Sequence, residues 1–318
     1  MSLKIVSGRA GSGKTSFMLD DMAGVSDAIY LVPEQYSFSA EKKIIERFGM
    51  CGLGCPEVMS FRKLARKIVS ESGAGNGIIS DNAVREMLIS FCTSDLPPEK
   101  MRLFDGLVRK KMLAPTASGL ITTFRRYNIT AEMLEKARTD TDNPVLEKKL
   151  ADCKTILDAY NTRLAECGAS DPEDIITLAA ELACGSAVFD GKSIYIDQFS
   201  DFDPQQYAFI GKMLEKAQRV CVGLCLDEDD PFSPTRRTRA ALMRLAERLG
   251  TAVEAEEYVM GAMKTASPML GCLEKMYFSE QSAPFAGADG SLRIFCGKTM
   301  AAEIHDAARR IVALVRDE

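Results

Sequence analysis

The sequence predicts an α/β protein with a parallel sheet, interrupted by a long insertion made only of helices. Three observations support this fold class. Strand-like and helix-like segments alternate over the first 80 residues, the alternation returns after about residue 186, and the region between has helical periodicity without a candidate strand. The chain has 318 residues, 46% of them hydrophobic, which is enough for a sizeable core.

The first strand and the loop after it carry the most specific motif. An apolar run over residues 3–7 leads directly into a stretch that fits the phosphate-loop pattern G-x-x-x-x-G-K-[ST] in full. In such a loop the backbone N–H groups face phosphate oxygens, Lys14 reaches the β- and γ-phosphates, and the hydroxyl of Thr15 ligates Mg²⁺. We therefore predict a nucleotide-phosphate site, against the alternative of a glycine-rich turn that binds nothing. Its residues are Gly8, Arg9, Ala10, Gly11, Ser12, Gly13, Lys14 and Thr15.

Two more strand–helix units follow the phosphate loop. Residues 28–32 form a predicted strand that Pro33 stops, and residues 40–48 a predicted helix. Residues 58–61 predict a short strand that turns into a helix over 62–69. Repeated strand–loop–helix units favour a parallel sheet, because each helix carries the chain back to start the next strand in the same direction.

The segment from about residue 80 to residue 185 has a different hydrophobic pattern, without candidate strands. Its amphipathic stretches are long and have the spacing of helices, so we predict an all-helical insertion over residues 81–185. The stretches are residues 84–92, 99–124, 131–137, 144–167 and 171–182.

The α/β pattern returns at residues 192–197, an apolar strand that ends in Asp197. At this place P-loop proteins carry the carboxylate that holds Mg²⁺, so Asp197 joins Thr15 as a predicted metal-site residue. A linker is predicted at 287–290, followed by the beginning of a domain that we expect the chain to leave unfinished. The remaining predicted elements are helix 204–217, strand 219–227, helix 235–249, strand 292–295 and helix 300–315.

Four stretches in this order resemble superfamily 1 DNA helicases, and most closely the AddB family, the helicase/nuclease subunits of bacterial recombination complexes. Residues 8–15 are similar to helicase motif I, and residues 58–65 resemble the segment T-F-H-x-L-A that meets DNA in that superfamily. Residues 171–176 resemble the D-F-x-D-L-L helix, and residues 196–207 the pattern V-D-E-F-Q-D-x-x-x-x-Q-Y. Residues 31–35 and 194–199 favour AddB over a motor helicase.

The resemblance implies a RecA-like P-loop domain 1A over residues 1–80 and 186–286, a helical domain 1B over 81–185, and the start of a truncated domain 2A over 287–318. It implies ATP and Mg²⁺ as ligands, and a heterodimer with an AddA-type helicase/nuclease subunit. The intact protein would take part in unwinding and resection of DNA ends during double-strand-break repair by recombination, scanning DNA for a hotspot. An exonuclease domain with an iron–sulfur cluster is implied only outside these residues.

Three departures from a working helicase predict weak hydrolysis. Gln198 stands where motif II has a Glu that activates the attacking water, and a neutral amide cannot act as a base. Residues 228–231 lack the Gln that senses the γ-phosphate, and only seven residues precede Gly8, which leaves no room for an adenine-contacting Gln segment. We therefore expect little or no ATPase activity and no nuclease activity from this chain.

Six residues are predicted to contact DNA, single-stranded DNA in particular. They lie in residues 33–39 and 60–63, which leave the carboxyl ends of parallel strands and which we call the rim; ligands bind at this edge of such sheets. Aromatic rings there would stack on bases and basic side chains would contact phosphates. Two alternatives stay open: core packing of Phe61, and a solvated helix face for the basic side chains. The six are Tyr36, Phe38, Ser60, Phe61, Arg62 and Lys63.

Composition limits the function classes. No apolar run reaches the ~18 residues of a membrane span and no signal precedes the first strand, so we expect a cytoplasmic protein without membrane contact. The net charge of −5 argues against a broadly basic surface but allows a local basic groove. Two other functions stay open: a small P-loop kinase, and a DNA- or partner-binding module with a vestigial nucleotide site.

Overall fold

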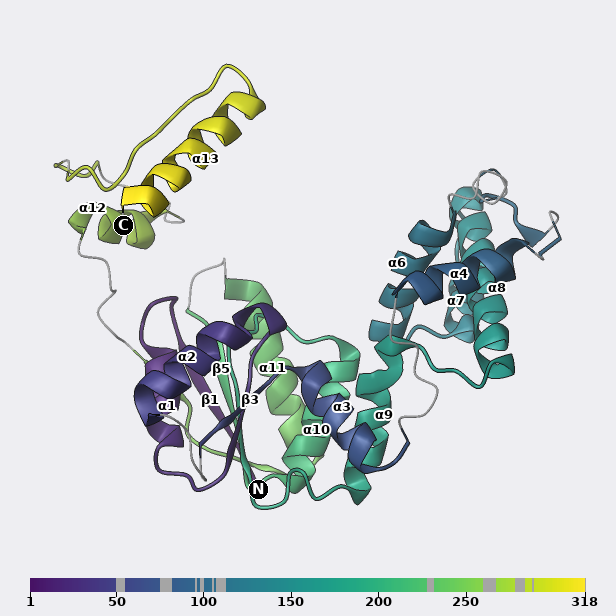
Figure 1. Cartoon of the computed structure of the whole chain (residues 1–318), viewed down its shortest axis with the longest axis horizontal. Helices are drawn as coiled ribbons and strands as arrows, with labels where there is room; N and C mark the ends of the chain where they lie inside the picture. The colour runs from purple at the N-terminus through teal and green to yellow at the C-terminus, as the bar shows by residue number, and fades with distance from the viewer. Residues whose placement is uncertain are drawn as a thin grey trace. The chain divides into compact units, whose positions relative to one another are not determined.

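The computed structural model describes residues 1–49, 55–74, 82–94, 96–97, 100–104, 106, 113–227, 232–259, 267–277, 284–287 and 289–317. It confirms the predicted fold class, a parallel sheet with helices and a helical insertion (Figure 1). Described residues up to 259 form one compact unit, which holds both the sheet and the insertion. Those from 267 onward belong to a second unit.

The described strands form a single seven-stranded sheet in which all pairs are parallel. The strand that leads to the phosphate loop, β1, and the strand that leads to Asp197, β4, are not neighbours, because β5 lies between them. A seventh strand, β7 (Glu257–Tyr258), pairs with β1 beyond β6. The order of the other six is β3 (Glu57–Met59), β2 (Ala28–Leu31), β4 (Ser193–Ile196), β5 (Arg219–Cys225), β1 (Ser2–Gly8) and β6 (Ala252–Val253).

Helices cover both faces of the sheet (Figure 1). Successive side chains of a strand point to opposite faces, so Ile29 and Leu31 enter one core and Tyr30 enters the other. The first face is covered by α3 (Phe61–Glu71), α9 (Ile175–Leu182), α10 (Pro204–Lys216) and α11 (Ser233–Arg248). The second is covered by α1 (Lys14–Met22) and α2 (Ser37–Phe48), which follows a short 3-10 turn, η1 (Glu34–Tyr36).

Gly223 of β5 lies directly against the side chains of Asp197 and Met18. A Cβ atom at this position would stand 2.8 Å from the Asp197 carboxylate oxygen Oδ1 and 2.8 Å from Sδ of Met18 on α1. Both distances are shorter than any normal contact. The missing side chain therefore leaves the room that the Asp197 carboxylate occupies over β5.

The insertion has apolar clusters of its own, which contain Ile89, Ile121, Ile156 and Leu157. The second half of the predicted helix 99–124 lies in α6, several residues of the first half fall outside the described ones, and residues 102–104 form bends. Those bends are held by Asp152, a fully buried carboxylate that accepts the backbone N–H groups of residues 102, 103 and 104 at 2.7–2.9 Å. The helices are α4 (Asn82–Ser94), α6 (Leu113–Arg126), α7 (Ala131–Thr139) and α8 (Pro144–Glu166).

A buried charged network links the insertion to η3 (Pro172–Asp174), the turn before α9. Arg85 of α4 is 1% exposed and pairs with Asp171, which is fully buried. Arg85 also donates to Thr122 Oγ1 at 2.6 Å, and the Tyr160 hydroxyl donates to Asp171 Oδ2 at 2.8 Å. Helices α4 and α8 therefore meet at the Asp171 carboxylate, and α6 joins the network through Arg85; the ion pair lies in a low-dielectric environment.

The second unit contains α12 (Pro268–Met276) and α13 (Met300–Asp317). The predicted helix 300–315 is confirmed as part of α13. The strand predicted at residues 292–295 was wrong: these residues have no strand partner among the described ones, and Ile294 is 91% exposed. An apolar segment becomes a strand only where a neighbour accepts its backbone hydrogen bonds.

Replacing Gly223 by Ala should lower the free energy of unfolding by about 1–3 kcal/mol, because the added methyl group overpacks the contact with Asp197 and Met18. The matched control is Gly211→Ala on α10, where the nearest atoms to a new Cβ lie 3.7 and 3.9 Å away. That change should be neutral or stabilise the protein by up to about 1 kcal/mol, since Ala favours helices. Urea denaturation measures both, and equal effects would contradict the packing argument.

Replacing Arg85 by Met should lower the free energy of unfolding by about 3–5 kcal/mol, because Asp171 would keep a buried charge without its cation. Arg163→Met is the control: its pair with Glu166 is about half exposed on both sides, and exposed pairs contribute about 0–1 kcal/mol. Urea denaturation again gives the two values. A loss for Arg85→Met no larger than that of the control would show that the network adds no stability.

Candidate functional site

The phosphate loop lies between the end of β1 and the start of α1. Gly13 is the N-cap of α1 and has a φ of 102°, in the left-handed region that a side chain disfavours. Its carbonyl accepts the N–H of Phe17 at 2.9 Å, which begins the helix. The Ser12 hydroxyl oxygen is buried and has no hydrogen-bond partner among the described residues. The loop thus presents a polar group and a helix N-terminus on the same short segment.

Lys14 is buried and folds onto its own loop. Its Nζ donates to the carbonyl oxygens of Gly8 and Arg9, each at 2.7 Å. Burial lowers the pKa of Lys14, while Cys225 and Asp197 act in the opposite direction. Its two acceptors are neutral carbonyls, so the ammonium group retains its capacity to attract an anion.

The two predicted metal-site residues are brought together. The Thr15 hydroxyl at the start of α1 donates to Oδ2 of Asp197 at 2.7 Å, and the Tyr30 hydroxyl of β2 donates to the same oxygen at 2.9 Å. Asp197 is 2% exposed. Burial first, and then the charge of this carboxylate, raise the pKa of Tyr30 above its ordinary value, so its hydroxyl stays protonated and remains a donor.

Gln198 also lies in this cluster. Its side-chain Nε2 donates to Thr15 Oγ1 at 3.1 Å and stands 3.4 Å from Asp197 Oδ2. Its backbone N–H donates to Asp197 Oδ1 at 2.8 Å, and its φ is 68°, which is uncommon for a residue with a side chain. The amide that replaces the expected base therefore contacts both predicted metal-site residues.

These residues fit a nucleotide phosphate and a divalent cation. Lys14 supplies the positive charge, the N-terminus of α1 supplies N–H groups, and the Ser12 hydroxyl is buried without a partner among the described residues. The oxygens of Thr15 and Asp197 are of the type that Mg²⁺ takes in proteins. The Gln198 NH₂ group is a hydrogen-bond donor, which a cation site does not require.

Arg9 has a partner that the sequence alone did not predict. Its Nε donates to Asp227, just after β5, and its guanidinium carbon lies 5.8 Å from the centroid of the Phe232 ring. In the sequence, the only indication of this pair is an Arg inside the loop motif and an Asp at the end of an apolar strand. The predicted lack of a γ-phosphate sensor at residues 228–231 falls outside the described residues.

The rim holds the six residues predicted to contact DNA, in different environments. Tyr36 and Phe38 are 43% and 79% exposed, so both rings are accessible. Ser60 is the N-cap of α3 and accepts the N–H of Lys63 at 3.2 Å. The Lys63 ammonium group donates to the Val58 carbonyl at 3.1 Å.

Phe61 and Arg62 are engaged within the protein. Phe61 is 3% exposed and packs edge-on against Phe199, with 5.2 Å between ring centroids, so the core-packing alternative describes its position. Arg62 pairs with Glu173 at 2.5 Å, and Arg126 donates to the same carboxylate at 3.0 Å. Burial acts to raise the pKa of Glu173, but the hydrogen bonds from both arginines outweigh it and lower the pKa.

A depression of about 260 Å³ opens at the rim. Its lining comes from the loop after β2, the start of α3, the turn η3 and the start of α10, and includes Pro33, Gln35, Arg62, Glu173 and Gln206. These segments, distant in sequence, thus form one polar surface of mixed charge at the carboxyl edge of the sheet.

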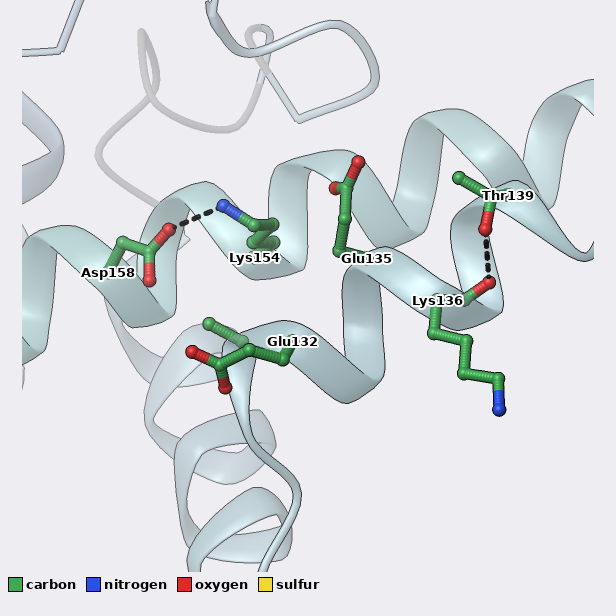
Figure 2. Close-up of a pocket in the computed structure, with 7 residues that line it drawn as sticks. Glu132, Glu135, Lys136, Thr139, Lys154 and Asp158 are labelled. Atoms are coloured by element: carbon green, nitrogen blue, oxygen red, sulfur yellow. Dashed lines mark hydrogen bonds and ion pairs between the residues drawn. The ribbon is translucent and has the colours of Figure 1, made fainter.

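A second depression, of about 520 Å³, lies between α7 and α8 (Figure 2). Lys154 donates to Asp158 there at 2.9 Å, and the Thr139 hydroxyl donates to the carbonyl of Lys136 at 2.8 Å. Glu132 and Glu135 complete the charged lining. Its charges are of both signs and lie on an open surface, so we assign it no chemistry.

Comparison with known proteins gives a family. Residues 5–274 match the model of the family described as "ADDB, N-terminal". Proteins named as subunits of an ATP-dependent helicase/deoxyribonuclease align with the whole chain: the one from Acetivibrio thermocellus is 33% identical, and those from Clostridium perfringens (strain SM101) and Desulforudis audaxviator are each 32% identical. Each alignment covers 100% of this chain and 29% of the relative.

The chain therefore spans less than a third of the length of these relatives. Among the described residues, no helix combines the length and the apolar composition needed to cross a membrane. The match to the family model covers most of the chain, including the phosphate loop, Asp197 and the helical insertion. On this evidence the chain belongs to the AddB family and corresponds to its N-terminal region.

Proposed function

We propose that this chain is the nucleotide-binding, helicase-like N-terminal part of an AddB-type subunit. The subunit would act with an AddA-type helicase/nuclease partner in ATP-dependent unwinding and resection of DNA ends, in the cytoplasm, during recombinational repair. The name of the relatives, which contains helicase and deoxyribonuclease, supports this role. The iron–sulfur cluster and the exonuclease activity of the intact protein are proposed for regions outside this chain.

The observation that carries the proposal is the complete phosphate loop, in which the Thr15 hydroxyl donates to Asp197 Oδ2 at 2.7 Å. Phosphates would be held by Lys14, by the hydroxyl of Ser12 and by the N–H groups at the start of α1. Any Mg²⁺ that accompanies the nucleotide would be held by Thr15 and Asp197 and would neutralise phosphate charge. The nucleotide would therefore bind through its phosphates.

Hydrolysis should be slow in this domain. Gln198 occupies the place of the general base and contacts Thr15, but an amide cannot accept the proton of the attacking water. A missing base lowers a rate by about 10²–10⁴-fold. A DNA-stimulated turnover on the order of 10 s⁻¹, ordinary for an enzyme, would contradict this part of the proposal.

Gln198 also supports a second candidate function, in which the nucleotide site is vestigial and the chain is only a DNA or partner platform. Membership of the AddB family argues against the other alternative, a small P-loop kinase. Nucleotide titration separates the first two functions, because a vestigial site would show no binding in the millimolar range.

The rim supports single-stranded DNA binding through its exposed rings. Tyr36 and Phe38 belong to the segment that leaves the carboxyl end of β2, and base stacking on such rings contributes about 1–3 kcal/mol per base. The cations contribute less, because Arg62 and Arg126 already share the Glu173 carboxylate. We propose contact with only one or two phosphates.

Replacing Lys14 by Ala should abolish binding of ADP or ATP, because the cation that faces the phosphates is removed. Isothermal titration calorimetry measures the affinity. Lys42→Ala, an exposed lysine on α2, removes the same charge away from the loop and should leave binding unchanged. Absence of binding by the parent chain at millimolar nucleotide would contradict the proposed nucleotide site.

Replacing both Tyr36 and Phe38 by Ala should weaken binding of a labelled single-stranded oligonucleotide about 30-fold or more, since two stacking rings are lost. Affinity of the parent should fall only about three- to sevenfold between about 50 and 200 mM salt, as expected for one or two phosphate contacts. Fluorescence anisotropy measures both effects.

The control for this experiment is Tyr127→Ala, which removes an exposed ring of the insertion, 57% accessible. It should leave DNA binding unchanged. Equal binding by the parent and the Tyr36/Phe38 double variant would place the DNA surface elsewhere.

A further inference from the structure

The carboxylate of Asp197 accepts three hydrogen bonds from within the protein. Oδ2 accepts the hydroxyls of Thr15 at 2.7 Å and Tyr30 at 2.9 Å, and Oδ1 accepts the backbone N–H of Gln198 at 2.8 Å. The carboxylate is 2% exposed, so these donors replace the water that it loses on folding. Its charge is therefore stabilised without a cation.

The side chain of Gln198 adds a fourth donor at the place where a cation would bind. Its NH₂ group lies 3.1 Å from Thr15 Oγ1 and 3.4 Å from Asp197 Oδ2, so it bridges the two predicted metal-site residues. Mg²⁺ requires nearly octahedral geometry with oxygens at about 2.0–2.1 Å. A cation on Thr15 beside Asp197 must therefore displace the amide and break these contacts.

The backbone holds Gln198 in this position. The left-handed φ of 68° is stabilised by the hydrogen bond from its own N–H to Asp197 Oδ1. A Glu at the same place would add a negative charge beside Asp197 and increase the attraction for a divalent cation. Gln instead adds hydrogen-bond donors and no charge, which favours the arrangement without metal.

We propose that the Gln198 carboxamide acts as a substitute for the metal ion, so that nucleotide binding by this chain depends little on Mg²⁺. The phosphates then rely on Lys14 and on the N–H groups of the loop. This inference rests on the proposed nucleotide binding. In this role Gln198 is a positioning residue, since it acts through Thr15 and Asp197.

The test is calorimetric titration of the chain with ADP, once with millimolar Mg²⁺ and once with excess EDTA. For the parent, the two dissociation constants should differ by less than about threefold. For Gln198→Glu, Mg²⁺ should tighten binding by about tenfold or more, equivalent to about 1.4 kcal/mol. Gln198→Ala removes the amide without adding charge, so its ratio of the dissociation constant in EDTA to that in Mg²⁺ should lie between those of the parent and Gln198→Glu.

Gln218→Glu is the matched control, because it adds the same charge at an exposed position before β5, at the opposite edge of the sheet. Its ratio of the ADP dissociation constants in EDTA and in Mg²⁺ should equal that of the parent. Tenfold or greater tightening of the parent by Mg²⁺, or an unchanged ratio for Gln198→Glu, would overturn the inference and leave nucleotide binding intact. No ADP binding in either buffer would overturn the proposed nucleotide site and this inference with it.

Discussion

The hydrogen bond between Thr15 and Asp197 is the interaction on which the candidate site depends. It joins the start of α1 to the end of β4, across the intervening strand β5. The carboxylate can lie over β5 only because Gly223 has no side chain. A buried charge must be hydrogen-bonded, and here the donors come from α1, from β2 and from the residue that follows Asp197. The positions of the phosphate loop and of Asp197 therefore depend on the strand order and on the packing around Gly223.

Much of the fold could be predicted from the sequence, because the central strands are buried on both faces and appear as continuous apolar runs. The short strands β6 and β7 could not. Each has only two residues, and each exists because β1 offers hydrogen bonds to it. The opposite error at residues 292–295 has the same cause: the pattern of a strand is present, but no partner strand is found among the described residues. Pairing is a tertiary property that local sequence does not encode.

Part of the candidate site could likewise be predicted from the sequence and part could not. The phosphate loop is a contiguous motif and Asp197 directly follows a strand, so the local sequence locates both. The environment of the rim could not, because Arg62 meets Glu173, a residue 111 positions away in sequence. Burial of Phe61 likewise depends on Phe199 from the loop after β4. Sequence patterns locate chemically capable side chains, but only the folded chain decides which of them face solvent.

Asp152 has a consequence for local unfolding. This one carboxylate on α8 accepts three consecutive backbone N–H groups, of Arg102, Leu103 and Phe104, which lie outside any helix or strand. Because they share an acceptor, these three amides lose their protection together when α8 opens around Asp152. In hydrogen–deuterium exchange they would form one cooperative unit with the middle of that helix. The protection of this bend against exchange is thereby tied to the stability of the helix that carries Asp152.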